Sequence, residues 1–264
     1  MSTIVNAVPS FLSLPSRTVK PRLSGITHVL DKGLPVSEVA ALLEVSGAHI
    51  DVWKLGWGTA YLDPGLIDKL AVLDHHGVLA CAGGTLFEVA FQQDAVDGYL
   101  DWCATVGFPC VEVSRGIATM SAQDKQRMVE RTAERFIVLA EVGAKDPKVE
   151  VTARAWALEA RADLAAGATW IITEGRESGT VGLYEPDGSV RSDVVDAVVQ
   201  AVGVGTAVFE APRKDQQAWL IRRFGPDVNL ANIPPASALE VEALRLGLCA
   251  DTFEVRTTAR DQDR

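Results

Sequence analysis

The feature that most restricts the fold is an eightfold alternation of short apolar runs with helical patterns. Each run is a few residues long and rich in Val and Ile, as in parallel strands that are buried on both faces. A charged or glycine-rich turn follows each run, and a segment with helical periodicity comes next. The runs are GITHVL (25–30), HIDVWKL (49–55), GVLACA (77–82), PCVEV (109–113), FIVLA (136–140), TWIIT (169–173), TAVF (206–209) and DVNLANI (227–233).

Boundary signals mark several of the intervening helices. Ser37 is the predicted N-cap of the helix that follows the first run, and Thr152 that of the helix before TWIIT, which Gly167 ends. The last helix follows two prolines and has the pattern of a capping box, in which Ser237 and Glu240 cap each other's backbone N–H groups.

Eight strands alternating with about eight helices predict an α/β fold, a single-domain (β/α)8 TIM barrel. We place an N-terminal tail, partly ordered, at 1–19, the catalytic barrel at 20–253 and a C-terminal tail at 254–264. A doubly wound open sheet is the alternative, but no GxGxxG fingerprint follows the first run.

Composition narrows the class of partner. The chain has 264 residues, is 48% hydrophobic and 23% charged, and carries a formal net charge of −10. This acidity argues against nucleic-acid or anionic-membrane surfaces, and no apolar run is long enough to span a bilayer. We expect a cytoplasmic protein, a possible homo-oligomer, with four free thiols that lack metal-ligand spacing. The cysteines are Cys81, Cys103, Cys110 and Cys249.

Carboxylates recur where the runs end. Glu112, Glu141, Glu174 and Glu210 each lie near the end of one, about one strand–helix unit apart, and Asp31 follows the first run. In a barrel these positions surround the C-terminal mouth, where such enzymes place their chemistry. So many carboxylates require cations nearby, because some would otherwise take up protons.

Basic residues lie close to these carboxylates. Lys32, Lys145 and Arg176 follow strand ends, and Lys54 lies within the apolar second run. A single one of them could be a structural ion pair or a side chain that reaches solvent. The repeated set predicts a site for an anion and a divalent cation.

These residue types restrict the chemistry. Lys and Arg suit phosphate and carboxylate groups, and carboxylates suit Mg²⁺. A desolvated lysine with a lowered pKa can transfer a proton at carbon. The residues therefore predict Mg²⁺-assisted chemistry on a small phosphorylated carboxylic acid, and a Schiff-base aldolase remains open.

Several motifs resemble those of the phosphosulfolactate synthase family, in order, from about Lys20 to Thr252. They are GITHVLDKG, HIDVWKLGWGTAYL, AEVGAKD, IITEGRESG, VFEAPRKDQQAWLIRRFGPDVNLANIPP and EALRLGLCADT. The resemblance implies a (β/α)8 lyase, of the carbon–sulfur class, that adds sulfite to phosphoenolpyruvate with Mg²⁺. The product would be 2-phospho-3-sulfolactate, on the way to coenzyme M.

Site roles follow from the resemblance and from the strand-end charges. The expected catalytic residues are Lys54, Lys145, Asp31 and Lys32. The expected substrate and phosphate ligands are Arg176, Arg213, Lys214 and Asn232. The expected magnesium ligands are Glu141, Glu174 and Glu210, or a subset of them.

The chain departs from the family pattern at Arg115, Arg213, Ala231 and Cys249. These changes leave two alternatives open. The same barrel and metal could serve a different nucleophile or enol phosphate, or the barrel could have lost catalysis and act as a binding protein.

Overall fold

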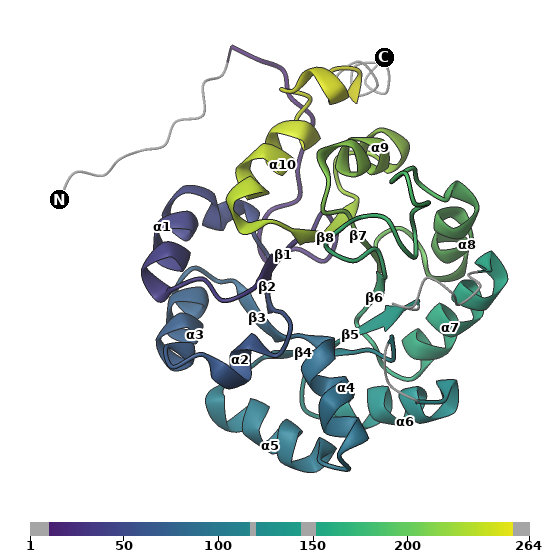
Figure 1. Ribbon diagram of the computed structural model, residues 1–264. Coiled ribbons are helices and arrows are strands. Elements are labelled where there is room, and N and C mark those ends of the chain that lie inside the picture. The colour runs from purple at the N-terminus through teal and green to yellow at the C-terminus, as the bar shows by residue number, and fades with distance from the viewer. Residues whose placement is uncertain (1–10, 117–119, 144–151, 256–264) are drawn as a thin grey trace.

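The structure is a computed structural model that describes residues 11–116, 120–143 and 152–255. Eight parallel strands form one closed barrel in the order β1 to β8, surrounded by helices (Figure 1). The strands are β1 (Thr27–Asp31), β2 (Val52–Leu55), β3 (Leu79–Ala82), β4 (Cys110–Val113), β5 (Ile137–Val142), β6 (Trp170–Thr173), β7 (Ala207–Glu210) and β8 (Asn229–Ile233).

Helices connect successive strands on the outside of the barrel. They are α1 (Val36–Ser46), α2 (Thr59–Leu62), α3 (Leu66–His75), α4 (Gly84–Gln92), α5 (Val96–Val106), α6 (Ala122–Ala133), α7 (Ala153–Ala165), α8 (Ser192–Val202), α9 (Lys214–Phe224) and α10 (Ala238–Arg245). The described residues also form three short 3₁₀ turns: η1 (Gly47–His49), η2 (Pro235–Ser237) and η3 (Ala250–Thr252).

The predicted (β/α)8 barrel is confirmed. Each of the eight apolar runs overlaps one strand, and β1 pairs with β8, for example Thr27 with Leu230. This closure excludes the open doubly wound sheet, whose edge strands remain unpaired.

The helix caps are only partly as predicted. Thr152 caps α7, because its hydroxyl accepts a hydrogen bond from Ala155 N at 3.2 Å. The prediction of Ser37 as an N-cap is wrong, because α1 begins at Val36, after Pro35, and Ser37 therefore lies inside the helix. Ser237 precedes α10 but makes no side-chain cap bond, so the expected capping box does not form. The 3₁₀ turn through Ser237 gives it a backbone conformation outside the usual extended N-cap range.

The barrel interior changes from apolar to charged along the strands. Alternate residues of a strand face inward. Val52, Cys110 and Leu139 belong to a buried interior cluster, and the next inward residue of each strand is charged. The same step of two holds for Ile172 and Val208. The charged residues that follow them are Lys54, Glu112, Glu141, Glu174 and Glu210.

A β-bulge in β8 interrupts this alternation. Thr27 pairs with Leu230 and Val29 with Ile233, so two residues of β8, Ala231 and Asn232, lie opposite one residue of β1. Asn232 has a positive φ of 54°, which asparagine tolerates better than most residues. The bulge re-aims its side chain into the barrel mouth.

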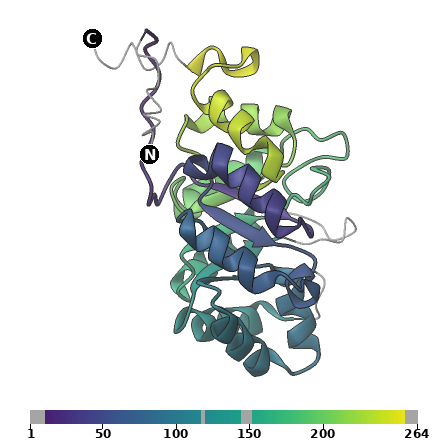
Figure 2. The same cartoon turned by 90° about the vertical axis from the view of Figure 1, so that its left-hand side faces the viewer.

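Residues 11–26, before β1, lie at the opposite end of the barrel from this mouth (Figure 2). The Arg17 guanidinium pairs with Asp227, just before β8, and with Glu242 of α10. The buried Arg245 donates to the carbonyl oxygens of Val228 and Ile26 at the start of β8 and β1. In the described ranges, no helix combines the length and apolarity that crossing a bilayer requires.

The caps generate a stability prediction. Thr152→Ala should lower the free energy of unfolding by about 1 kcal/mol, because it leaves an N-terminal N–H of α7 without its acceptor. Ser237→Ala is the matched control and should change stability by only a few tenths of that amount. Urea unfolding of both variants checks this, and equal losses would contradict the assignment of the caps.

Candidate active site

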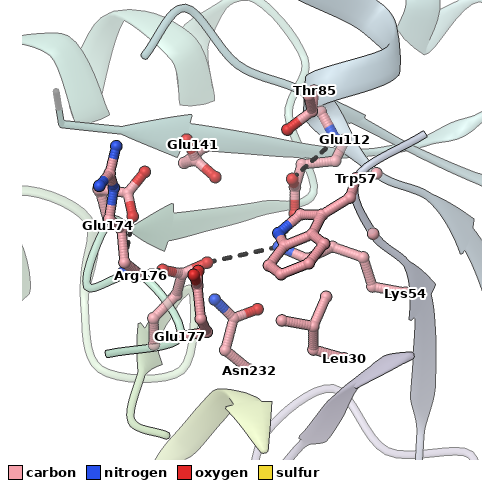
Figure 3. Close-up of a pocket in the computed structure, with 14 residues that line it drawn as sticks. Leu30, Lys54, Trp57, Thr85, Glu112, Glu141, Glu174, Arg176, Glu177 and Asn232 are labelled. Carbon is pink, nitrogen blue, oxygen red and sulfur yellow. Dashed lines mark hydrogen bonds and ion pairs between the residues drawn. The ribbon is translucent and has the colours of Figure 1, made fainter. Parts of the chain in front are cut away.

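A cavity of about 250 Å³ opens at the carboxyl ends of the strands. Side chains from the ends of β1 and β2 and from β4 to β8 contribute to its wall (Figure 3). The lining residues are Leu30, Lys54, Gly56, Trp57, Gly83, Gly84, Thr85, Glu112, Glu141, Glu174, Arg176, Glu177, Glu210 and Asn232.

The ammonium of Lys54 links two carboxylates across this mouth. Its Nζ lies 2.9 Å from Glu112 Oε2 and 3.4 Å from Glu210 Oε1. All three side chains are buried, and they come from β2, β4 and β7. The interaction therefore connects strands that do not neighbour one another in the barrel.

The pKa of Lys54 moves in the direction opposite to our expectation. Burial by itself lowers the pKa of this ammonium, but the carboxylates of Glu112, Glu210 and Glu141 outweigh burial and hold the pKa well above its ordinary value. We expected a desolvated lysine with a lowered pKa, whereas the carboxylate neighbours of Lys54 raise its pKa. Lys54 is therefore an ammonium that can donate a proton.

Backbone amides hold both carboxylate partners of Lys54. Glu112 Oε1 accepts from Gly84 N at 2.9 Å, and Glu210 Oε2 accepts from Gly175 N at 2.8 Å and Arg176 N at 2.9 Å. Gly84 cannot carry a side chain here, because a Cβ atom would lie 2.3 Å from Ser114 Oγ.

Burial raises the pKa of Glu210. Together with the negative charges of Glu141 and Glu112, burial outweighs the effect of the Lys54 charge on this pKa. One ammonium does not compensate several carboxylates, so Lys54 and Glu210 both bind their protons more tightly.

The IITEGRESG stretch forms the turn after β6. Glu174 Oε1 accepts a hydrogen bond from Arg176 N at 2.7 Å, and Arg176 has a positive φ of 54°. Gly143 packs against this turn so closely that a Cβ atom there would lie 2.6 Å from Glu174 Cβ. The turn thereby brings a carboxylate and a guanidinium to the same side of the cavity.

The three predicted metal ligands all line the cavity, but they have different partners. Both oxygens of Glu210 are engaged, one by Lys54 and the other by backbone N–H groups. Glu141 and Glu174 come from the adjacent strand ends of β5 and β6. Within residues 11–116, 120–143 and 152–255, no three His, Cys, Asp or Glu side chains form a preformed metal cage. The donor set suits Mg²⁺, which takes one or two carboxylates and completes its shell with water and substrate oxygens.

Four predicted site residues do not line the cavity. Asp31 is buried beside it, where it accepts from Trp53 Nε1 at 3.0 Å and Lys69 Nζ at 3.1 Å. Lys32 is exposed, and its ammonium lies 5.0 Å from the centre of the Trp57 ring. The other two are exposed on and before α9 and pair with aspartates: Arg213 with Asp215 and Lys214 with Asp251. Lys145 lies outside the described residues.

Several lining residues were given no role in the sequence prediction. Glu112, which lies one residue before the end of β4, was recognised among the rim carboxylates but was not assigned to the site. Trp57 has a positive φ of 53° and half of its surface exposed at the mouth. Leu30 belongs to the first apolar run, whereas Thr85 and Glu177 carried no periodic signal of their own.

The departures from the family pattern lie outside the lining. Arg115 makes a bidentate interaction with Glu159, at 2.9 and 2.7 Å. Ala231 belongs to the apolar interior, and Cys249 lies 3.2 Å from Asp251 Oδ2. These residues alter the surroundings of the cavity and not its wall.

A polar charged cavity at the carboxyl ends of a (β/α)8 barrel is the arrangement of enzymes that act on small polar molecules. The family model described as (2R)-phospho-3-sulfolactate synthase (ComA) matches residues 15–251. The chain belongs to the phosphosulfolactate synthase family.

Similar proteins support this membership. The phosphosulfolactate synthase of Bacillus subtilis (strain 168) is 38% identical over 245 residues, which is 92% of this chain and 97% of that protein. The phosphosulfolactate synthase of Methanocaldococcus jannaschii is 40% identical over 235 residues, covering 87% of this chain and 94% of that protein. A crystal structure of 3-hexulose-6-phosphate synthase superposes with a TM-score of 0.54 at 17% identity, covering 83% of this chain and 99% of that one. This last likeness concerns the fold alone.

His28, an inward residue of β1, generates a pH prediction. Burial, reinforced by the charge of Lys54, lowers the pKa of His28 well below 6.5, so the folded protein keeps it neutral. As the pH falls below about 6.5, the unfolded chain binds a proton that the folded chain does not, and stability decreases.

His28→Gln should remove this contribution. Between about pH 6 and pH 5, its free energy of unfolding should fall less steeply than that of the wild type, by up to about 1.4 kcal/mol per pH unit. Urea unfolding at several pH values measures the two slopes. Identical slopes would mean that His28 is protonated in the folded state.

Proposed function

We propose that this protein is a carbon–sulfur lyase that adds sulfite to phosphoenolpyruvate in the presence of Mg²⁺ and yields 2-phospho-3-sulfolactate. Family membership supports the reaction class. The observation that carries the proposal is the buried Lys54 ammonium, which faces a cavity where Glu141, Glu174 and Arg176 converge.

The charge of the cavity favours a divalent cation. Five glutamates and two basic side chains occur among the lining residues that the structure describes, so the wall is acidic. Phosphoenolpyruvate and sulfite are both anions, and an acidic wall repels them. A bound Mg²⁺ reverses this local charge, since its own charge is often the largest in a site.

Glu141 and Glu174 would hold the metal, because Glu210 is engaged by Lys54 and by backbone N–H groups. A bound Mg²⁺ supplies Lewis-acid stabilisation to carboxylate oxygens that gain negative charge during the reaction. Arg176 would bind the phosphate through its planar guanidinium, and the Asn232 amide, from β8, would orient the substrate.

The reaction forms one carbon–sulfur bond. The sulfur lone pair of sulfite attacks the terminal CH₂ carbon, and the electron pair of the C=C bond moves into the carboxylate as an enolate-type anion. Lys54 donates a proton to the central carbon, and this carbon becomes tetrahedral. Solvent re-protonates the lysine, so the net reaction consumes phosphoenolpyruvate and bisulfite.

Two features support Lys54 as the proton donor. Its raised pKa keeps the ammonium charged before the substrate binds, and its anchoring by Glu112 and Glu210 fixes the direction from which it approaches. Delivery from one direction gives one configuration at the new stereocentre. Lys145 is the other candidate donor from the sequence, and the variant below distinguishes the two.

Phosphorus NMR tests the reaction. Purified protein with phosphoenolpyruvate, Mg²⁺ and sulfite should give a new phosphate-ester signal that disappears when any one of the three is omitted. Replacement of sulfite by a simple thiol tests the choice of nucleophile. A signal that forms with the thiol and not with sulfite would overturn the sulfite assignment.

Lys54→Met should lower turnover by roughly 10² to 10⁴, because it removes the proton donor and keeps a side chain of similar length. Arg135→Met removes an exposed cation near the other end of β5 and should leave turnover within about twofold. Circular dichroism should show that both variants are folded. Wild-type turnover in Lys54→Met would move the role to Lys145.

Glu141→Gln and Glu174→Gln should each raise the Mg²⁺ concentration needed for half-maximal turnover by about tenfold or more, because a neutral amide is a weaker magnesium ligand. Glu130→Gln, which changes an exposed glutamate on α6, is the matched control. Unchanged magnesium dependence in both site variants would remove these residues from the metal site.

A further inference from the structure

Lys125 of α6 lies immediately behind the cavity wall and takes no part in the reaction described above. Its side chain is 0% exposed, although it carries a charge. A buried ammonium is costly unless all of its N–H groups are paired.

Each of the three N–H groups of Lys125 has an acceptor. Its Nζ lies 2.5 Å from the carbonyl oxygen of Glu141, 2.8 Å from Glu159 Oε1 and 2.6 Å from Asp163 Oδ2. The two carboxylates come from α7, and Glu159 also receives both hydrogen bonds of Arg115. These four side chains contribute two positive and two negative charges, so the cluster is balanced.

The contact with Glu141 occurs where the sheet gives β5 less support. The pairing of β5 with β4 ends at Val113 and Ala140, whereas its pairing with β6 continues to Val142 and Thr173. The Glu141 carbonyl thus lies beyond the last pair with β4. Lys125 supplies a hydrogen bond at the point where the ladder has stopped.

We infer that Lys125 is a positioning residue: its buried ammonium joins the end of β5 to α7 and so fixes the direction in which the Glu141 side chain enters the cavity. The inference rests on the proposed function in one respect, that Glu141 binds the divalent cation. Partners that orient a metal ligand typically change metal affinity by 10- to 100-fold when they are removed.

Another buried lysine provides a matched control. Lys69 of α3 is 1% exposed and also pairs with two carboxylates, Asp31 at 3.1 Å and Asp63 at 2.6 Å. It holds the end of β1, and neither it nor its two partners lines the cavity. A change at Lys69 therefore costs comparable stability without reaching Glu141.

The experiment compares two charge-balanced double variants of the full chain, Lys125→Met/Asp163→Asn and Lys69→Met/Asp63→Asn. The first should weaken Mn²⁺ binding, measured by electron paramagnetic resonance, by roughly 10- to 100-fold, and the second by less than about twofold. Hydrogen exchange should quicken by about tenfold or more in a peptide covering 137–143 of the first variant only. A folded Lys125→Met/Asp163→Asn protein with wild-type exchange in this peptide overturns the inference.

The two readouts separate this inference from the proposed function. If the wild-type protein does not bind Mn²⁺, the cation site fails, and exchange at 137–143 still decides the role of Lys125. If Mn²⁺ binds and exchange quickens but affinity is unchanged, Lys125 supports only the strand and the positioning role is overturned. If the double variant does not fold, Lys125→Gln replaces it in both measurements with the same expected and contrary results, since its shorter side chain cannot reach all three acceptors.

Discussion

The site depends on one buried ammonium among carboxylates. Lys54 bridges Glu112 and Glu210, and backbone N–H groups hold the outer oxygens of both glutamates. Without this positive charge, several carboxylates would face one another in a poorly solvated space, and some would have to take up protons. The same ammonium is the proton donor in the reaction that we propose. The positive charge of Lys54 therefore both offsets the buried carboxylates and serves in the proposed reaction.

A second kind of lysine secures the strand ends from outside. Lys69 of α3 and Lys125 of α6 are fully buried, and each pairs with two acidic side chains. The partners of Lys69 are Asp31 at the end of β1 and Asp63, and those of Lys125 are Glu159 and Asp163 of α7. Lys69 holds Asp31, which lies beside the cavity, whereas Lys125 holds the backbone of Glu141, which lines it. Residues of α3 and α6, none of which lines the cavity, thus support strand ends at the mouth.

The residues that depart from the family pattern also lie outside the cavity wall. Arg115 joins the balanced cluster around Lys125 through Glu159, and Arg213, just before α9, pairs with Asp215 of that helix. Neither side chain lines the cavity. The metal-binding carboxylates and the proton donor that we propose are therefore separate from these substitutions, which alter the shell behind the wall.

The sequence by itself determined the barrel and the ring of rim charges. Both follow from local periodicity: eight buried runs need eight parallel strands, and a step of two along each strand places its last inward residue at the mouth. Only the tertiary structure decided which charges meet. Lys54 pairs with glutamates that lie 58 and 156 residues away in the chain, and Asp31 pairs with Lys69. A β-bulge that the sequence pattern does not predict directs the Asn232 side chain inward. Pairing depends on the distances that barrel closure creates between strands far apart in the chain, and periodicity within one strand carries no information about them.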